Sequence, residues 1–257
     1  MSLVEMKNIH KRFGGVVALR GVDFEVGDNE VIGLIGDNGA GKSTLQKILS
    51  GLYPPTEGEI FIRGEKVDTK NYSVKKAHEM GIETVFQEKA LGQKQALWRN
   101  IFLGRQPTTK FGYLDVEEAK NETTRIMKQF LGFTGAGISP ESTVSTLSGG
   151  ERQGIAIGRA MYFEADLIIL DEPTNALSVK EIGKVLDFIE EVKRQGKSVV
   201  YISHTIAHIY EVSDRFVILD KGKVADRREK GELTEQELID ELTHHAKKSE
   251  EAQKEEL

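Results

Sequence analysis

Residues 36–44 carry the first combination of residue types that could do chemistry, reading Gly-Asp-Asn-Gly-Ala-Gly-Lys-Ser-Thr. The stretch matches G-x-x-x-x-G-K-[ST], a pattern in which glycines let the chain turn so that backbone N–H groups approach phosphate oxygens. Lys42 supplies a positive charge to the β- and γ-phosphates, and the Ser43 hydroxyl is a ligand for Mg²⁺. A purely structural turn is the alternative, but a buried strand before the loop and a helix after it favour a nucleoside triphosphate site. The residues expected to contact the nucleotide are Gly36, Asp37, Asn38, Gly39, Ala40, Gly41, Lys42, Ser43 and Thr44.

Two neighbouring carboxylates, Asp171 and Glu172, follow the apolar run Leu167–Leu170. At the end of a buried strand, Asp171 is predicted to hold Mg²⁺ and Glu172 to polarise the water that attacks the γ-phosphate. Acids at this place also suit the first turn of a following helix, which they stabilise through its dipole. The phosphate-binding pattern upstream makes the catalytic interpretation the stronger one.

A histidine ends the next apolar run, because Ser198–Ile202 is followed by Ser203 and His204. A single histidine is usually only a polar surface residue. Its position at a strand end nevertheless predicts that His204 contacts the γ-phosphate oxygens and orients Glu172.

A second possible phosphate-binding segment is Leu147–Gln153, which reads Leu-Ser-Gly-Gly-Glu-Arg-Gln. Ser148, Gly149 and Gly150 form another helix start, where backbone N–H groups and the helix dipole attract an anion. Two phosphate-binding segments on one chain make sense if they serve two nucleotides.

The elements that position these groups predict an α/β fold. The runs Val31–Ile35, Leu167–Leu170 and Ser198–Ile202 are almost continuously apolar, which is typical of strands covered on both faces. Residues spaced as on one helix face are Leu45, Ile48, Leu49 and Leu52 after the loop, and Ile182, Val185, Leu186 and Ile189 between the last two strands. Alternating strands and helices predict a mostly parallel sheet that binds ligands at the carboxyl ends of its strands.

Other patterns predict smaller additions to this core. Leu3–Ile9 and Val22–Val26 have the apolar residues of two paired strands, which indicates an antiparallel β subdomain. Phe216–Leu219 and Lys223–Ala225 are separated by a turn and predict a late hairpin. Helical patterns dominate residues 91–146.

We therefore expect a single domain over residues 1–230, with a helical subdomain inserted at about 91–153. Residues 231–257 are expected to form a short helix and a charged, frayed tail. Thr234 and Glu237 have the spacing of a capping box that opens this helix.

The composition excludes several classes of protein. The 257 residues contain no cysteine, so disulfides and zinc–thiolate sites are excluded. The formal charge of −6 argues against a broad nucleic-acid surface. We find neither a signal peptide nor an apolar run long enough to span a bilayer, which favours the cytoplasm and membrane association through a protein partner.

Taken in order, these motifs resemble those of the ATP-binding cassette (ABC) ATPase family. The segment Leu147–Gln153 resembles the signature motif of that family. The similarity extends from Phe13 to Gly222 and implies a P-loop NTPase, RecA-like core that binds ATP and Mg²⁺. It also implies a head-to-tail homodimer formed with ATP. In that dimer, Ser148–Gly150 of one copy grips the γ-phosphate held by Lys42 of the other.

The resemblance assigns two further residues. Phe13 matches the aromatic residue that stacks on adenine, although a phenylalanine at a strand end is often a core residue. Gln87, after the apolar stretch Thr84–Phe86, matches the family's Q-loop glutamine. That glutamine contacts Mg²⁺ and the attacking water and senses the transmembrane partner.

Two positions depart from the family pattern. Ser178 stands where the family has an aspartate that helps to couple the two sites, so strict coupling does not follow from the resemblance. Glu151 stands where glutamine is commonest.

The stretches Glu151–Ile157 and Asn175–Glu181 resemble the monosaccharide-importer branch of the family (ribose, xylose and fructose types), in its single-cassette form. This resemblance implies an ATPase that energises an importer from the cytoplasmic face of the membrane. Its partners are then a second copy, transmembrane permease subunits and, indirectly, an extracytoplasmic sugar-binding protein, with no nucleic acid.

Two other functions are considered. A soluble ABC ATPase that acts on nucleic acid normally has a long coiled coil between the phosphate-binding segment and the signature, and this sequence has no such coiled-coil pattern there. One that acts on ribosomes normally has two cassettes joined by a basic linker, and this sequence shows no such linker. A regulatory module that binds ATP without turnover is opposed by the intact Glu172 and His204.

Overall fold

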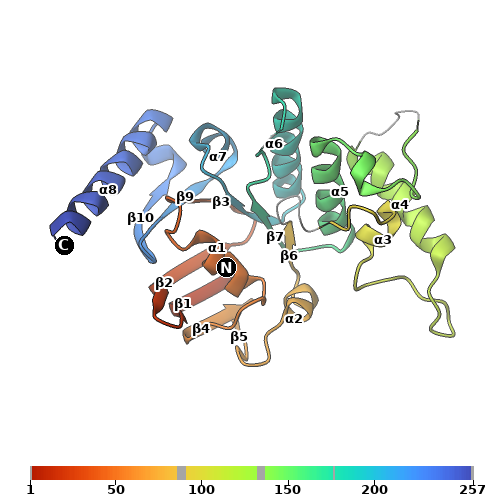
Figure 1. Cartoon of the computed structure of the whole chain (residues 1–257), viewed down its shortest axis with the longest axis horizontal. Helices are drawn as coiled ribbons and strands as arrows, with labels where there is room; N and C mark the ends of the chain where they lie inside the picture. Colours follow the sequence, from red (N-terminus) through yellow and green to blue (C-terminus); the bar gives the residue numbers. More distant parts are fainter. Residues whose placement is uncertain (1, 86–90, 132–136, 176, 256–257) are drawn as a thin grey trace. The chain divides into compact units, whose positions relative to one another are not determined.

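The chain forms two compact units. The computed structural model describes residues 2–85, 91–131, 137–175 and 177–255 (Figure 1). The first unit consists of residues 1–84, 165–172 and 186–257, and the second of residues 85–164 and 173–185. Within the described ranges, no helix is both long and apolar enough to cross a bilayer.

A six-stranded sheet is the centre of the first unit. In spatial order its strands are β10 (Lys223–Glu229), β9 (Arg215–Asp220), β3 (Val31–Ile35), β8 (Ser198–Ile202), β7 (Leu167–Asp171) and β6 (Ile82–Val85). β3 pairs in parallel with β8 and β9, and β7 pairs in parallel with β8, while β9 and β10 form an antiparallel pair. Every residue of β3 and β8 is buried, as expected for strands covered on both faces. The predicted parallel sheet and late hairpin are confirmed.

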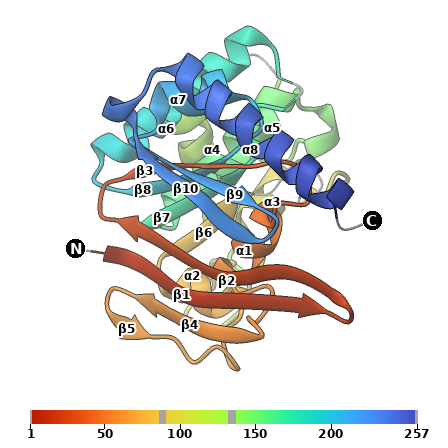
Figure 2. The same ribbon diagram turned by 90° about the vertical axis from the view of Figure 1, so that its left-hand side faces the viewer.

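The second sheet is antiparallel and packs on the first. Its strands, in the order β2 (Val16–Gly27), β1 (Ser2–Phe13), β4 (Glu57–Ile62) and β5 (Glu65–Lys66), lie side by side (Figure 2). Side chains of β1 and β2 such as Met6 and Phe24 join Ile169 and Val200 of the parallel sheet in one apolar core. This core surrounds the buried face of α1 (Lys42–Leu49). The phosphate loop, which leads into α1, is thereby anchored to both sheets.

The other helices of the chain are distributed along it. They are α2 (Val74–Glu79), α3 (Leu97–Ile101), α4 (Val116–Leu131), α5 (Gly149–Tyr162), α6 (Val179–Arg194), α7 (Ile206–Val212) and α8 (Glu235–Glu255), with 3₁₀ turns at Val144–Thr146 and Lys230–Glu232. α3, α4 and α5 belong to the second unit and share an apolar cluster that includes Trp98, Ile126 and Ile155. These helices lie where the sequence predicts a helical segment, and the predicted domain boundaries stay a prediction.

The two helix ends that the sequence addresses give different outcomes. The helix after the phosphate loop ends at Leu49, and Gly51, whose φ of 73° turns the chain out of the helix, is the residue expected to stop it. Leu52, which has the spacing of the same helix face, lies beyond this end and is 45% exposed. At the other end, α8 continues to Glu255, whereas the sequence predicts a short helix with a frayed tail. The predicted capping box is present, since Thr234 N donates to Glu237 Oε2 (2.7 Å) and Glu237 N donates to Thr234 Oγ1 (3.3 Å).

Candidate functional site

The phosphate loop turns sharply between β3 and α1, and only glycine fits two of its positions. Gly36 has a φ of 150°, and a Cβ there would lie 2.3 Å from the carbonyl oxygen of Leu219. Gly41 has a φ of 110°, and a Cβ there would lie 2.8 Å from Leu19 Cδ2. These values are far below contact distance, so the path of the loop depends on the two glycines.

Within the loop, burial differs from residue to residue. Ala40 is buried, and its carbonyl accepts from Gly222 N at 2.9 Å, which ties the loop to the turn after β9. The exposed residues of the predicted nucleotide-contacting set are Asp37, Asn38, Gly39 and Ser43, and the half-buried ones are Gly36, Gly41, Lys42 and Thr44. The exposed backbone and the Ser43 hydroxyl are therefore accessible to a ligand.

Lys42 is held against the loop that precedes it. Its Nζ donates to the carbonyl oxygens of Gly36 and Asp37, the latter at 3.1 Å. Burial lowers the pKa of Lys42, and this is partly opposed by the carboxylates of Glu172 and Asp37. A half-buried ammonium group whose pKa is lowered is stabilised by a strong anion, which is what a phosphate provides.

The two carboxylates predicted from the sequence lie at the carboxyl end of β7. Asp171 is the last residue of that strand, and Glu172 N donates to the carbonyl oxygen of Ile202 on β8 (2.8 Å). Burial and, after it, the charge of Glu172 raise the pKa of Asp171. Glu172 has a φ of 50°, which is unusual for a residue with a side chain and is typical of functional positions.

Glu172, after β7, contacts Ser203 and His204, which follow β8. Its Oε2 lies 3.0 Å from His204 Nδ1 and accepts a hydrogen bond of 3.2 Å from Ser203 Oγ. Ser203 is buried, whereas 68% of the His204 side chain is exposed, so the imidazole is open to a ligand. Ser203 was not predicted as a functional residue. The only signal for it was a polar residue at the end of a buried strand, next to His204.

Of the two residues assigned by resemblance, the structure describes Phe13 only. Phe13 ends β1 and is 44% exposed, with its ring edge-to-face with Tyr53 (centroids 5.5 Å apart) and Lys11 Nζ 5.0 Å from its centroid. The ring is partly exposed, so it is accessible to a base. Gln87 lies outside the described residues.

The signature segment opens α5 in the second unit. Ser148 is its N-cap, and the pair Ser148–Glu151 forms a capping box: Ser148 N donates to Glu151 Oε2 (2.7 Å), and Glu151 N donates to Ser148 Oγ (3.3 Å). Glutamate serves this motif as well as glutamine does, which explains why Glu151 is tolerated. The N–H of Gly150 donates to Oε1 of Glu181 (2.9 Å), an acid for which the sequence motifs predict no role.

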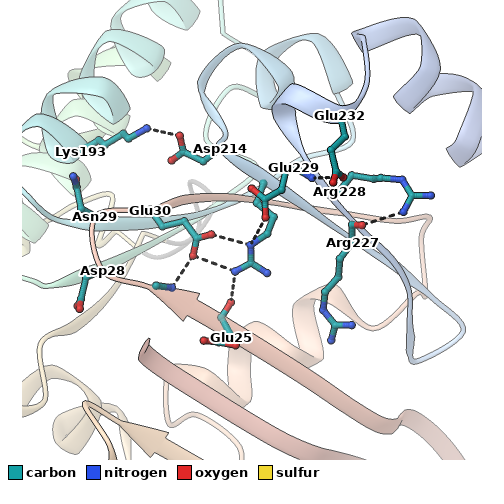
Figure 3. Close-up of a pocket in the computed structure, with 12 residues that line it drawn as sticks. Glu25, Asp28, Asn29, Glu30, Lys193, Asp214, Arg227, Arg228, Glu229 and Glu232 are labelled. Carbon is teal, nitrogen blue, oxygen red and sulfur yellow. Dashed lines mark hydrogen bonds and ion pairs between the residues drawn. The ribbon is translucent and has the colours of Figure 1, made fainter. Parts of the chain in front are cut away.

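A hollow of about 720 Å³ lies elsewhere in the first unit, at the amino ends of β3 and β9 (Figure 3). Its charged groups largely pair with one another: Arg215 Nε lies 2.8 Å from Glu30 Oε1, and Lys193 pairs with Asp214. Because ligands of parallel sheets bind at the opposite, carboxyl edge, we regard this hollow as a structural ion-pair cluster.

Comparison with known proteins gives consistent matches. The sequence profile of the family described as ABC transporter matches residues 19–175. The chain is 41% identical over 244 residues to the xylose/arabinose import ATP-binding protein XylG of Sulfolobus acidocaldarius, covering 95% of each chain. It is 36% identical over 237 residues to the ribose import ATP-binding protein RbsA of Caldanaerobacter subterraneus, covering 92% of this chain. It spans about half of that relative's length (47%).

Solved structures agree with the fold. A dimeric ATP-binding cassette in a post-hydrolysis state, bound to ADP and Pi, is 26% identical and superposes with a TM-score of 0.75 over 88% of this chain and 98% of that chain. The ADP conformation of an ATP-binding cassette of an ABC transporter is 23% identical, with a TM-score of 0.77 over 95% of each chain. At that identity, the second match supports the fold alone.

Proposed function

The chain belongs to the ABC transporter family. We propose that it is the ATP-hydrolysing subunit of a monosaccharide importer. The observation that carries the ATPase assignment is the meeting of Glu172, Ser203 and His204 at the strand edge, in the same unit as the phosphate loop. The sugar assignment is supported by relatives that are named import ATP-binding proteins for xylose/arabinose and ribose.

ATP is bound by the phosphate loop and by Lys42. Backbone N–H groups of residues 36–44 and the amino end of α1 face the phosphates, and the ammonium group exchanges its loop carbonyls for phosphate oxygens. Phe13 stacks on the adenine. The donors for Mg²⁺ are the hydroxyl of Ser43 and the carboxylate of Asp171, both oxygen ligands of the kind that this ion prefers, together with Gln87.

The raised pKa of Asp171 supports this magnesium site. Burial and the charge of Glu172 disfavour the ionised carboxylate, so a cation at this place relieves both effects. When bound, Mg²⁺ supplies positive charge that neutralises the phosphate oxygens during cleavage.

Glu172 is the general base. Its carboxylate orients the attacking water and takes up the proton as the oxygen approaches the γ-phosphate. Ser203 holds one carboxylate oxygen, while the exposed imidazole of His204 contacts the same oxygen and can donate to the γ-phosphate.

A second copy completes each site. Ser148, Gly149 and Gly150 of one copy bind the γ-phosphate held by Lys42 of the other, and two ATP molecules join the copies head to tail. Hydrolysis and phosphate release remove the charge that joins them, and the resulting motion drives permease subunits in the membrane. An extracytoplasmic sugar-binding protein delivers the solute, and the chain acts on the cytoplasmic face. The relatives cited above are named import ATP-binding proteins, which favours this function over the nucleic-acid and regulatory alternatives.

The test measures phosphate release by the purified chain with Mg²⁺ and ATP, in the parent and in Glu172→Gln. We expect Glu172→Gln to bind ATP normally and to hydrolyse it about 10³-fold more slowly. Hydrolysis at the parent rate would remove Glu172 as the base. Uptake of labelled xylose, ribose and galactose into liposomes that also contain the permease and binding protein tests the sugar assignment. ATP hydrolysis that is insensitive to every sugar-loaded binding protein would refute it.

A further inference from the structure

Glu181 lies at the amino end of the signature helix, although it belongs to another helix. It is in the first turn of α6, 31 residues after Gly150, yet its Oε1 accepts the Gly150 N–H at 2.9 Å. Its other oxygen, Oε2, accepts from Ser178 N at 2.9 Å and from Ser178 Oγ at 2.7 Å. All of these residues belong to the second unit.

The contact between the two helices is close. A Cβ on Gly150 would lie 2.5 Å from both Cγ and Oε1 of Glu181, so glycine at this position is what admits the carboxylate. Gly150 therefore provides room for an anion directly at its N–H group. Glu181 fills that room.

The carboxylate remains charged under physiological conditions. Hydrogen bonds from the Ser178 backbone and side chain, followed by the Gly150 N–H, lower the pKa of Glu181 to about 2. Protonation therefore does not remove the negative charge when a second anion approaches. Two anions that require the same N–H group exclude each other, because like charges at contact distance repel.

We propose that Glu181 occupies the phosphate-binding position of the signature segment and that the γ-phosphate from a second copy must displace it. This inference rests on the proposed function, in which the signature binds that phosphate. Displacement breaks the bond to the Gly150 N–H and the hydrogen bond with the Ser148 side chain. The two bonds that Ser178 donates to Oε2 do not involve the signature segment. Glu181 thus raises the ATP concentration that is needed to join two copies. Ser178, which departs from the family pattern, holds the carboxylate in place.

The experiment measures ATP-dependent dimerisation of the full chain by light scattering, in a Glu172→Gln background that prevents turnover. The variants are Glu181→Gln, which keeps the size and an acceptor but removes the charge, and Glu181→Ala, which removes both. Glu190→Gln is the matched control, since Glu190 is an exposed acid on the same helix and loses the same charge. Thermal unfolding of each variant verifies that it is folded.

Because charge-assisted hydrogen bonds are about twice as strong as neutral ones, both Glu181 variants should dimerise at a roughly tenfold lower ATP concentration. Glu190→Gln should match the parent. If Glu181 serves only to fix the two helices, its variants will need as much ATP as the parent or more, which would overturn the proposal and leave the proposed function intact. If no chain dimerises at any ATP concentration, the two-copy site itself is wrong and the proposal falls with it.

Discussion

Replacing Gly36 with alanine tests the geometry of the phosphate loop most sharply. The new Cβ would lie 2.3 Å from the carbonyl oxygen of Leu219 and 3.1 Å from Ala40 Cβ. Ordinary contact begins at 3.4 Å, so the loop or the end of β9 must move by about 1 Å. Overpacking of this kind costs about 1–3 kcal/mol, in addition to the roughly 1–2 kcal/mol for placing alanine at a positive φ.

Two other glycines separate these contributions. Gly39 and Gly64 have φ values of 85° and 78°, and neither would bring a new Cβ within 4 Å of another group. Gly39→Ala and Gly64→Ala should therefore show only the backbone cost. Gly36→Ala should unfold at a melting temperature about 4–8 °C lower than either, which corresponds to about 2 kcal/mol for a chain of this size.

The affinity for ATP should also differ between the glycine variants. A displacement of about 1 Å moves the N–H groups of the loop away from the phosphates, and the loss of about two charge-assisted hydrogen bonds weakens binding by on the order of 100-fold. Isothermal titration with ATP should show this loss for Gly36→Ala and parent affinity for Gly64→Ala. Equal melting temperatures for Gly36→Ala and Gly39→Ala would refute the steric reasoning.

Three further substitutions test the site and its surroundings. Lys42→Ala should weaken ATP binding by about 10–100-fold, because a charge-assisted contact to phosphate is lost, and unchanged affinity in a titration would contradict the role of the loop. Ser203→Ala should lower kcat by about 2–10-fold with KM unchanged, because one hydrogen bond that holds Glu172 is removed. Steady-state phosphate release measures both constants. A change in KM alone would contradict the role of Ser203 in positioning Glu172. Arg215→Ala leaves the mostly buried Glu30 without its cation, so it should lower the free energy of unfolding, measured in urea, by about 1–3 kcal/mol. The affinity for ATP should not change. A change in that affinity would indicate that a ligand binds in the hollow of Figure 3.

The elements that could be predicted correctly from the sequence are those encoded by short local patterns. The buried strand Val31–Ile35, the loop that follows it and the hairpin of β9 and β10 are each encoded by a few consecutive residues, whose periodicity and glycines specify the backbone. The same holds for the capping box at Thr234, which is a four-residue motif.

The contacts that were missed join segments far apart in the chain. Ser203 and Glu172 are separated by 31 residues, as are Glu181 and Gly150, and no motif spans either interval. The pairing of β1 with β4 is likewise long-range, and the periodicity of β1 does not specify its neighbour. Such contacts follow only from the assembled sheets and helices, because tertiary packing selects among many compatible partners.

If a second copy of the chain completes each catalytic pocket, the rate of ATP hydrolysis per chain depends on the chain concentration. Phosphate release with saturating Mg²⁺ and ATP is measured across chain concentrations from nanomolar to micromolar. We expect the rate per chain to rise with chain concentration and then to level off once nearly all chains are dimeric. A rate per chain that stays constant over the whole range, for a chain that remains monomeric, would contradict it.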